Sequence, residues 1–294
     1  MVAERGVGTV LASFGRGVLV QTPDAVLQCG LLGRKLKVVC GDRVAWKYPP
    51  AADDPSVESV ETRRNLIERM DARGRPEAVA ANIDRLGIVV GVEPEPDWFL
   101  VDRYWAGAAL KDVEAVLIVN KVDLGGESHQ GQLDEYRQLN LKCIEVSCVR
   151  GTGMDELKVL LDDSVTMLVG QSGVGKSSLV NALAPQAAAQ TAHLTKDQEG
   201  RHTTTTARWY PLSRAAALID APGVRDFAPP ASIPRAAERG FIEIRSRIAD
   251  CRFKDCRHME EPGCAVRSAV LKQEISPRRY ESYRRLFRLY QRLS

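Results

Sequence analysis

A glycine-rich segment near the middle of the chain carries residues suited to binding phosphate groups. It fits the pattern G-x-x-x-x-G-K-[ST], with Gly170, Gly175, Lys176 and Ser177 at the fixed positions. In such a loop the glycines let backbone N–H groups surround the β- and γ-phosphates, Lys176 adds a positive charge, and Ser177 is suited to ligating magnesium. We expect Lys176 to serve catalysis too. The predicted phosphate loop comprises Gly170, Gln171, Ser172, Gly173, Val174, Gly175, Lys176, Ser177 and Ser178.

A second segment is suited to recognising a guanine base. Asn120, Lys121, Val122 and Asp123 follow the apolar run 115–119 and should therefore lie where a parallel strand ends. The Asp123 carboxylate can accept hydrogen bonds from the guanine ring N–H and exocyclic amine, donors that adenine does not present there. Alone, such a tetrapeptide is more often a polar turn. Beside a phosphate loop it favours a guanine site.

Other short segments fit the same chemistry. Ser147 and Cys148 follow the β-rich run 144–146 and resemble the turn whose backbone N–H contacts the guanine carbonyl in GTPases. Asp220 and Gly223 follow another apolar run and resemble a loop in which Asp holds magnesium through water and the Gly amide senses the γ-phosphate.

Between the phosphate loop and Asp220 lies a run of hydroxyl side chains, Thr203 to Thr206. Such hydroxyls can complete a magnesium shell, and the ligand would be either Thr204 or Thr205. A threonine run is otherwise an ordinary polar loop.

Cysteine and histidine cluster near the C-terminus at a spacing typical of a metal site. Cys251, Cys256, His258 and Cys264 supply three thiolates and one imidazole within fourteen residues. Zinc in structural sites prefers a closed tetrahedron of such ligands, whereas a catalytic zinc keeps one position open. We therefore predict one structural zinc ion. The alternative is a chance group of free thiols and a surface histidine.

Regular elements must position these loops. The apolar run 167–169 indicates a buried strand just before the phosphate loop, and residues 176–183 indicate a helix with Leu179, Val180 and Leu183 on one face. A chance match of a glycine-rich turn is disfavoured because strand, loop and helix occur in the required order. We predict a multidomain α/β protein in which residues 65–228 form a doubly wound, mostly parallel sheet.

The order of the two loops is unusual, because the guanine-reading segment precedes the phosphate loop by about fifty residues. The reverse order is the ordinary one, so the chain looks like a circularly permuted GTPase. The segment that ends at Gly223 then leads directly into the Cys/His region, so loss of the γ-phosphate would act on that region.

The first 64 residues differ from the rest of the chain in their residue pattern. Short β-rich runs separated by glycines and turn residues predict a small barrel of the oligonucleotide-binding (OB) type over residues 1–64. Its basic residues from Arg34 to Lys47 would either contact an RNA backbone or only make the domain soluble. The Pro/Asp-rich stretch 49–55 indicates an exposed loop. The runs expected to form strands are 8–11, 17–20, 26–29, 36–39 and 43–46.

The last part of the chain, residues 229–294, is basic and is predicted to form a zinc-binding and helical domain. It holds fifteen Lys and Arg against eight Asp and Glu. Its aromatic residues at helical spacing form either a docking face or part of a nucleic-acid surface, and the clustered arginines favour binding to a phosphate backbone over a merely solvated face. These aromatic residues are Tyr280, Tyr283, Phe287 and Tyr290.

Composition narrows the class of protein. The chain has 294 residues, a net charge of +3 and no run of eighteen apolar residues, and its start lacks a hydrophobic signal stretch. Seven cysteines, an odd number, argue against a disulfide framework. We expect a cytoplasmic protein without a membrane partner.

Taken in order, a β-barrel, a guanine loop, a phosphate loop and a Cys3His module resemble the ribosome small-subunit-dependent GTPase A (RsgA) family, over nearly the whole chain. Further marks are residues 80–84 before a strand and Gly200-Arg-His-Thr-Thr-Thr205. The resemblance implies a monomeric GTP hydrolase using magnesium and one zinc. It also implies binding to the small ribosomal subunit and its rRNA late in maturation, stimulation by the subunit, and dissociation on hydrolysis.

Two positions bear on catalysis. Ala221 stands where the family usually has Thr or Ser, which should not abolish activity. Val224 occupies the place where many GTPases carry the Gln that orients water, so intrinsic turnover should be slow. His202 is the candidate catalytic group, against the alternative of a plain surface histidine.

Two other classes of function stay open at this point. A phosphotransferase would use the phosphate loop to phosphorylate a small metabolite and would need an acceptor pocket with a catalytic carboxylate. An RNA-binding scaffold with a vestigial nucleotide site would not need Lys176, Ser177, Asp123 and Asp220 to be intact, as they are.

Overall fold

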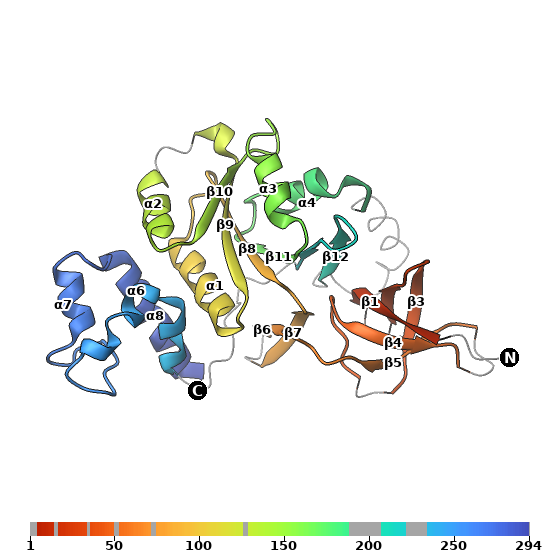
Figure 1. Cartoon of the computed structure of the whole chain (residues 1–294), viewed down its shortest axis with the longest axis horizontal. Coiled ribbons are helices and arrows are strands. Elements are labelled where there is room, and N and C mark those ends of the chain that lie inside the picture. Colours follow the sequence, from red (N-terminus) through yellow and green to blue (C-terminus); the bar gives the residue numbers. More distant parts are fainter. Residues whose placement is uncertain are drawn as a thin grey trace.

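The computed structural model describes residues 5–14, 17–33, 36–49, 53–71, 75–125, 129–187, 207–221 and 234–293. Figure 1 shows an N-terminal barrel, a central sheet with its helices, and a C-terminal group of helices, with the barrel and the C-terminal group on opposite sides of the central sheet. The multidomain α/β architecture predicted from the sequence is confirmed.

The barrel is closed by five strands in the order β1-β2-β3-β5-β4. Its interior is apolar because side chains of alternate residues point inward along each strand, as at Val18, Val20 and Val44. The strands are β1 (Arg5–Phe14), β2 (Gly17–Gln21), β3 (Val26–Leu31), β4 (Arg43–Lys47) and β5 (Ser56–Val60).

One predicted barrel strand is wrong. Residues 36–39 form no strand, although Val38 packs into the barrel core, and the fifth strand is β5. The buried carboxylate of Asp42 explains the difference. It accepts a hydrogen bond from the Val39 N–H (2.8 Å) and forms an ion pair with Arg63 (2.7 Å). A backbone amide bonded to this side chain is diverted from strand pairing.

A hairpin of β6 (Leu66–Met70) and β7 (Pro76–Ala81) connects the barrel to the central sheet. The contact with the barrel is specific, since Cys40 forms a β-bridge with Ala80 and the Asn82 side chain donates to the Gly41 carbonyl (2.9 Å). The segment 80–84 therefore fixes the junction between barrel and sheet.

The central sheet has the order β10-β9-β8-β11-β13-β12 and is parallel apart from the β12–β13 pair. Its four inner strands have near-continuous apolar sequences, as is typical of strands covered by helices on both faces. They are β8 (Arg85–Gly91), β9 (Glu114–Asn120), β10 (Lys142–Val146), β11 (Val165–Gly170), β12 (Arg208–Pro211) and β13 (Ala217–Asp220).

Helices α1 (Trp98–Leu110) and α2 (Gln130–Gln138) pack on one face of this sheet, and α3 (Met154–Leu161) and α4 (Lys176–Leu183) pack on the other. The predicted helix 176–183 is confirmed, with Leu179 and Val180 buried. The sheet is therefore doubly wound, and its strand ends open between the two helical layers.

The C-terminal unit consists of short helices around α8, and its core contains Phe241 and the aromatic face of α8. Gly240 packs so close to α1 that a Cβ there would lie 2.2 Å from the Cα of Ala106. The docking interpretation of the aromatic residues is correct, because Tyr283, Phe287 and Tyr290 are buried. The elements are η4 (Pro234–Gly240), α6 (Ile242–Arg245), η5 (Ile248–Asp250), α7 (Ala265–Leu271) and α8 (Pro277–Leu293).

Among the described residues, no helix combines the length and apolar character that crossing a membrane requires.

Candidate nucleotide and metal sites

The predicted nucleotide loops all leave the same edge of the central sheet. Asn120 ends β9, Gly170 ends β11 and Asp220 ends β13, and parallel pairing places these carboxyl ends side by side. In open α/β sheets this edge is where ligands bind. Segments far apart in the sequence are thus brought to one crevice.

Direct hydrogen bonds join the predicted guanine-reading segment to the predicted phosphate loop. The Asn120 side-chain amide donates to the Val174 carbonyl (3.0 Å), and the Lys121 ammonium donates to the Gly173 carbonyl (2.7 Å). Asn120 is only 2 % exposed, so its amide has little access to water as an alternative partner. These contacts fix the distance between the two loops.

Gly175 makes this close approach possible. Its φ of 93° lies in the left-handed region, and a Cβ at this position would lie 2.3 Å from the Asn120 amide nitrogen. Any side chain would therefore displace the Asn120 amide as well as strain the backbone. The second glycine of the phosphate pattern thus also serves the packing between the loops.

Lys176 begins α4 and lies back across the phosphate loop. Its ammonium donates to the carbonyls of Gly170 (2.9 Å) and Gln171 (2.6 Å). The positive charge is therefore held next to the N-terminus of α4, where free backbone N–H groups also favour an anion. Ser177 follows in the first turn of the same helix.

The turn at Ser147 and Cys148 orients the Asp123 side chain. The Ser147 hydroxyl donates to the Asp123 carboxylate (2.5 Å) and in turn accepts a hydrogen bond from the Arg150 N–H (3.0 Å). The bond from Ser147 lowers the pKa of Asp123, so the carboxylate is ionised at neutral pH. Cys148 donates weakly from its thiol to the Asn120 side-chain oxygen (3.6 Å). An ionised, fixed carboxylate is what paired guanine donors require.

Asp220 presents a second carboxylate beside the phosphate loop. Burial raises its pKa, while the nearby charges of Lys176 and Arg208 act in the opposite direction. Asp220 pairs in register with Leu168, two residues before the phosphate loop, and a desolvated carboxylate is a ligand that suits a hard divalent cation. The chemistry of the residues present therefore fits magnesium.

Some predicted site residues lie outside the described part of the chain. They are His202, Thr204, Thr205 and Gly223, together with Val224, which stands where many GTPases carry a water-orienting Gln.

One segment of the site was not anticipated. The Glu93 carbonyl accepts a hydrogen bond from Lys121 (2.8 Å), and the Gln171 side chain accepts one from the Asp97 N–H (3.0 Å). The loop between β8 and α1 therefore contacts both nucleotide loops. No residue pattern marks it, because its contacts are made largely through backbone groups.

The four predicted metal ligands come together in the C-terminal unit. Their ligand atoms all lie within 4.8 Å of one another, and the Cys251 and Cys264 sulfurs each lie 3.5 Å from Nδ1 of His258. Cys264 immediately precedes α7, and Cys256 and His258 are buried.

The chemistry of this cluster fits a metal dication. Burial, with the nearby thiols Cys264 and Cys251, raises the pKa of Cys256 to about 12. Burial lowers the pKa of His258, which keeps its imidazole neutral and able to ligate. A bound cation would offset the free-energy cost of ionising these buried thiols, because it stabilises the negative charge of the thiolates. The His258 Nε2 is buried, has no hydrogen-bond partner among the described residues, and lies 3.8 Å from the Glu238 carboxylate.

Comparison with known proteins agrees with this arrangement. A family model described as RsgA GTPase matches residues 60–229. A protein of Azotobacter vinelandii named small ribosomal subunit biogenesis GTPase RsgA is 41% identical over 290 residues, which cover 95% of this chain and 84% of that protein. A protein of the same name from Pseudomonas aeruginosa is 42% identical over 285 residues, again covering 95% and 84%.

Solved structures show the same fold. The crystal structure of YjeQ from Thermotoga maritima matches 98% of this chain and 99% of its own, with a TM-score of 0.76 and 29% identity. The structure of YloQ, described as a circularly permuted GTPase, matches 99% and 96% with a TM-score of 0.73; at 22% identity it supports the fold alone.

Proposed function

Since the chain belongs to the RsgA GTPase family, we propose that it is a ribosome biogenesis GTPase. It binds the small ribosomal subunit late in maturation, hydrolyses GTP to GDP and phosphate, and dissociates on hydrolysis. The observation that carries the proposal is the pair of hydrogen bonds from Asn120 and Lys121 to the phosphate loop. They support the proposal because they hold the segment that carries Asp123 against the predicted phosphate loop.

In this proposal Asp123 accepts hydrogen bonds from the guanine ring N–H and exocyclic amine, and the turn at Ser147 and Cys148 supports the guanine carbonyl. The backbone N–H groups of residues 170–178 surround the phosphates. Lys176 exchanges its present carbonyl partners for phosphate oxygens and stabilises the charge that develops during transfer.

Magnesium would be held by Ser177 and by either Thr204 or Thr205, with Asp220 acting through water, and it supplies charge stabilisation for the β- and γ-phosphate oxygens. The Gly223 amide would sense the γ-phosphate. His202 orients the attacking water, because Val224 has no hydrogen-bonding group to do so. Slow intrinsic turnover and stimulation on the ribosomal subunit follow from that arrangement.

Zinc would be held by Cys251, Cys256, His258 and Cys264 as a structural ion. Its role is to fix the loop between η5 and α7 against α8. We propose that the basic residues of this C-terminal unit and of the barrel contact rRNA, with the three units acting as domains over residues 1–64, 65–228 and 229–294. The protein acts as a monomer in the cytoplasm.

The test is GTP hydrolysis by the purified chain with and without purified small ribosomal subunits. We expect slow turnover that the subunits raise, a preference for GTP over ATP, and loss of turnover in Lys176→Ala. Equal use of ATP would contradict the guanine site. A phosphorylated metabolite in place of free phosphate would indicate a phosphotransferase, and absence of turnover with and without subunits would indicate a scaffold.

A further inference from the structure

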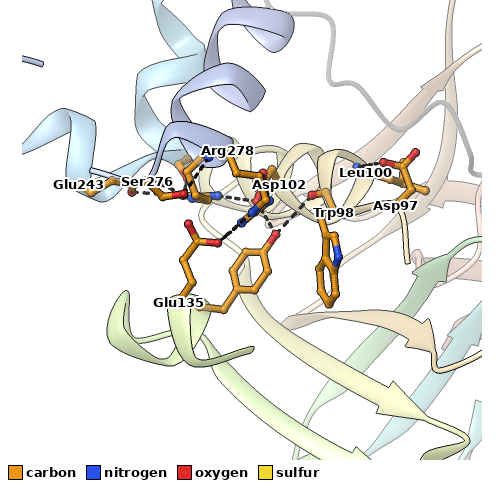
Figure 2. A network of polar contacts seen from close by, with 11 residues as sticks. Asp97, Trp98, Leu100, Asp102, Glu135, Glu243, Ser276 and Arg278 are labelled. Atoms are coloured by element: carbon orange, nitrogen blue, oxygen red, sulfur yellow. Dashed lines mark hydrogen bonds and ion pairs between the residues drawn. The ribbon is translucent and has the colours of Figure 1, made fainter. Parts of the chain in front are cut away.

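A buried cluster of charges joins the C-terminal unit to the helices of the central sheet. Figure 2 shows Arg278 of α8 pointing to Asp102 of α1 and Glu135 of α2. Arg278 donates to the Asp102 carboxylate (3.0 Å) and to the Glu135 carboxylate (2.9 Å). Arg279 donates to the other Asp102 oxygen (2.7 Å) and to Glu243 of α6 (2.8 Å). Two arginines thus share one carboxylate on α1.

The innermost pair of this cluster is fully desolvated. Arg279 and Asp102 are both 0 % exposed, and the Arg279 guanidinium lies over the rings of Trp105 (4.8 Å) and Phe241 (4.4 Å). A buried pair of this kind resists separation, because pulling one partner away leaves an uncompensated charge. Helices α1 and α8 should therefore move together.

The first turn of α1 contacts the phosphate loop. Asp97 caps the helix by accepting a hydrogen bond from the Leu100 N–H (3.1 Å), and its own N–H donates to the Gln171 side chain (3.0 Å). The Gln171 amide group also donates to the Glu95 carbonyl (3.4 Å). Gln171 is thus the phosphate-loop residue whose side chain binds the start of α1.

Helix α8 also contacts the predicted metal centre. The Tyr280 hydroxyl donates to the His258 carbonyl (2.6 Å), and the Tyr283 hydroxyl donates to the Arg257 carbonyl (3.0 Å). A continuous series of contacts therefore runs from the metal-binding loop through α8, the Asp102 cluster and α1 to Gln171.

We propose that Gln171 is a positioning residue for hydrolysis, and that the C-terminal unit sets the shape of the phosphate loop through α8, Asp102 and α1. The inference rests on the proposed GTPase function. The connection through α1 is separate from the one expected at Gly223, because it reaches the phosphate loop through Gln171. Contact of the C-terminal unit with the ribosomal subunit then alters the loop that binds the β- and γ-phosphates.

The variant that tests the connection is Arg278→Gln. It removes the ion pairs by which Arg278 joins α8 to Asp102 of α1 and Glu135 of α2, and so weakens the connection. Arg279 keeps Asp102 paired, so the innermost charge stays compensated. The matched control is Arg284→Gln on the same helix, since Arg284 contacts residues of α8 itself: its ion pair is with Glu281 (3.0 Å), and its guanidinium lies 5.7 Å from the centre of the Tyr280 ring. Arg278→Lys is the conservative variant, which keeps the charge.

Hydrolysis is measured with and without small subunits, with subunit affinity determined by co-sedimentation. We expect Arg278→Gln to lower the subunit-stimulated kcat by about tenfold while basal turnover and subunit affinity stay within about twofold. Arg278→Lys should restore part of the loss, and Arg284→Gln should behave as the wild type. Combining Gln171→Leu with Arg278→Gln should cost no more stimulation than the larger single loss, because both interrupt one connection.

Full stimulation in Arg278→Gln, or losses that multiply in the double variant, would overturn the inference. Hydrogen exchange of the unliganded chain supplies an arm independent of hydrolysis. There the Asp97 amide should exchange faster in Arg278→Gln than in Arg284→Gln, and equal rates would also refute the connection. A wild type that subunits do not stimulate refutes the proposed function instead, and the exchange arm still decides the inference.

Discussion

Replacing Gly175 by alanine perturbs the contact on which the nucleotide crevice depends. The new Cβ would lie 2.3 Å from the Asn120 amide nitrogen, in a backbone conformation with φ of 93°. Because the neighbouring Val174 carbonyl accepts the bond from that amide, the side chain has to leave its acceptor. The hydrogen bond that Asn120 makes between the two loops should therefore be lost even without nucleotide.

The expected destabilisation has two contributions. A left-handed backbone costs alanine roughly 1–2 kcal/mol relative to glycine. Loss of the Asn120 hydrogen bond leaves a buried donor unpaired, which costs roughly 1–3 kcal/mol. Gly175→Ala should therefore lower the free energy of unfolding by about 2–5 kcal/mol.

Gly173 offers a matched control within the same loop. Its φ is 82°, but a Cβ there would meet only the Pro94 Cδ at 3.8 Å, an ordinary contact. Gly173→Ala should consequently show the backbone cost alone, roughly 1–2 kcal/mol. Urea unfolding of the unliganded chain, with both variants also made in an Asn120→Ala background, measures the difference.

In the Asn120→Ala background the clash is absent, and Gly175→Ala should cost no more than Gly173→Ala. Equal destabilisation by the two glycine variants in the otherwise wild-type chain would refute the reasoning, since it would mean that Asn120 and Gly175 do not press on each other.

Three other changes have defined outcomes. Asp123→Asn should weaken GTP binding and favour xanthosine triphosphate, as measured by nucleotide competition; retained guanine selectivity would refute the base contact. Burial raises the pKa of Asp220, so its charge at neutral pH opposes folding, and that destabilisation fades as the pH falls through the raised pKa. Asp220→Asn should therefore raise the melting temperature at pH 7 while abolishing magnesium-dependent hydrolysis. A lowered melting temperature would contradict the statement that the Asp220 charge destabilises the fold. Cys264→Ser should reduce the zinc content below one ion per chain and speed hydrogen exchange over residues 251–264, whereas Cys143→Ser should change neither; full zinc content in Cys264→Ser would exclude that ligand.

Much of the nucleotide crevice could be predicted because its chemistry is local in sequence. The phosphate loop needs glycines, Lys176 and a strand before it, all within a dozen residues, and β11 and α4 form where the apolar pattern predicts them. Placement of Asn120 beside Val174 then follows from the topology of parallel strands, whose carboxyl ends share one edge.

The contacts that join distant elements could not be predicted. Asp102 occurs within an otherwise mainly apolar helix, and nothing nearby in the sequence indicates that Arg278 and Arg279 pair with it. Gln171 occupies a variable position of the phosphate pattern, so its bond to Asp97 has no sequence mark. The mistaken strand at 36–39 has a partly similar origin. Asp42, which accepts the bond from the Val39 N–H, is close in sequence, but Arg63, which pairs with Asp42 and donates to the Lys37 carbonyl (2.9 Å), lies far along the chain.

Two arginines of α8 form buried ion pairs within the protein, although an arginine-rich helix also suggests binding to nucleic acid. The clustered charge of this helix predicted contact with a phosphate backbone, yet Arg279 is completely buried and Arg278 is largely so. Both are occupied by carboxylates of the central sheet's helices and of α6. The proposed contact of the C-terminal unit with rRNA would therefore use its other basic residues.

A crystal structure of the chain with a non-hydrolysable GTP analogue and magnesium tests the central claim most directly. We predict the guanine base against Asp123 and the β-phosphate within the loop 170–178 of the same molecule. A nucleotide whose base lies away from Asp123, or whose phosphates lie outside that loop, would contradict it.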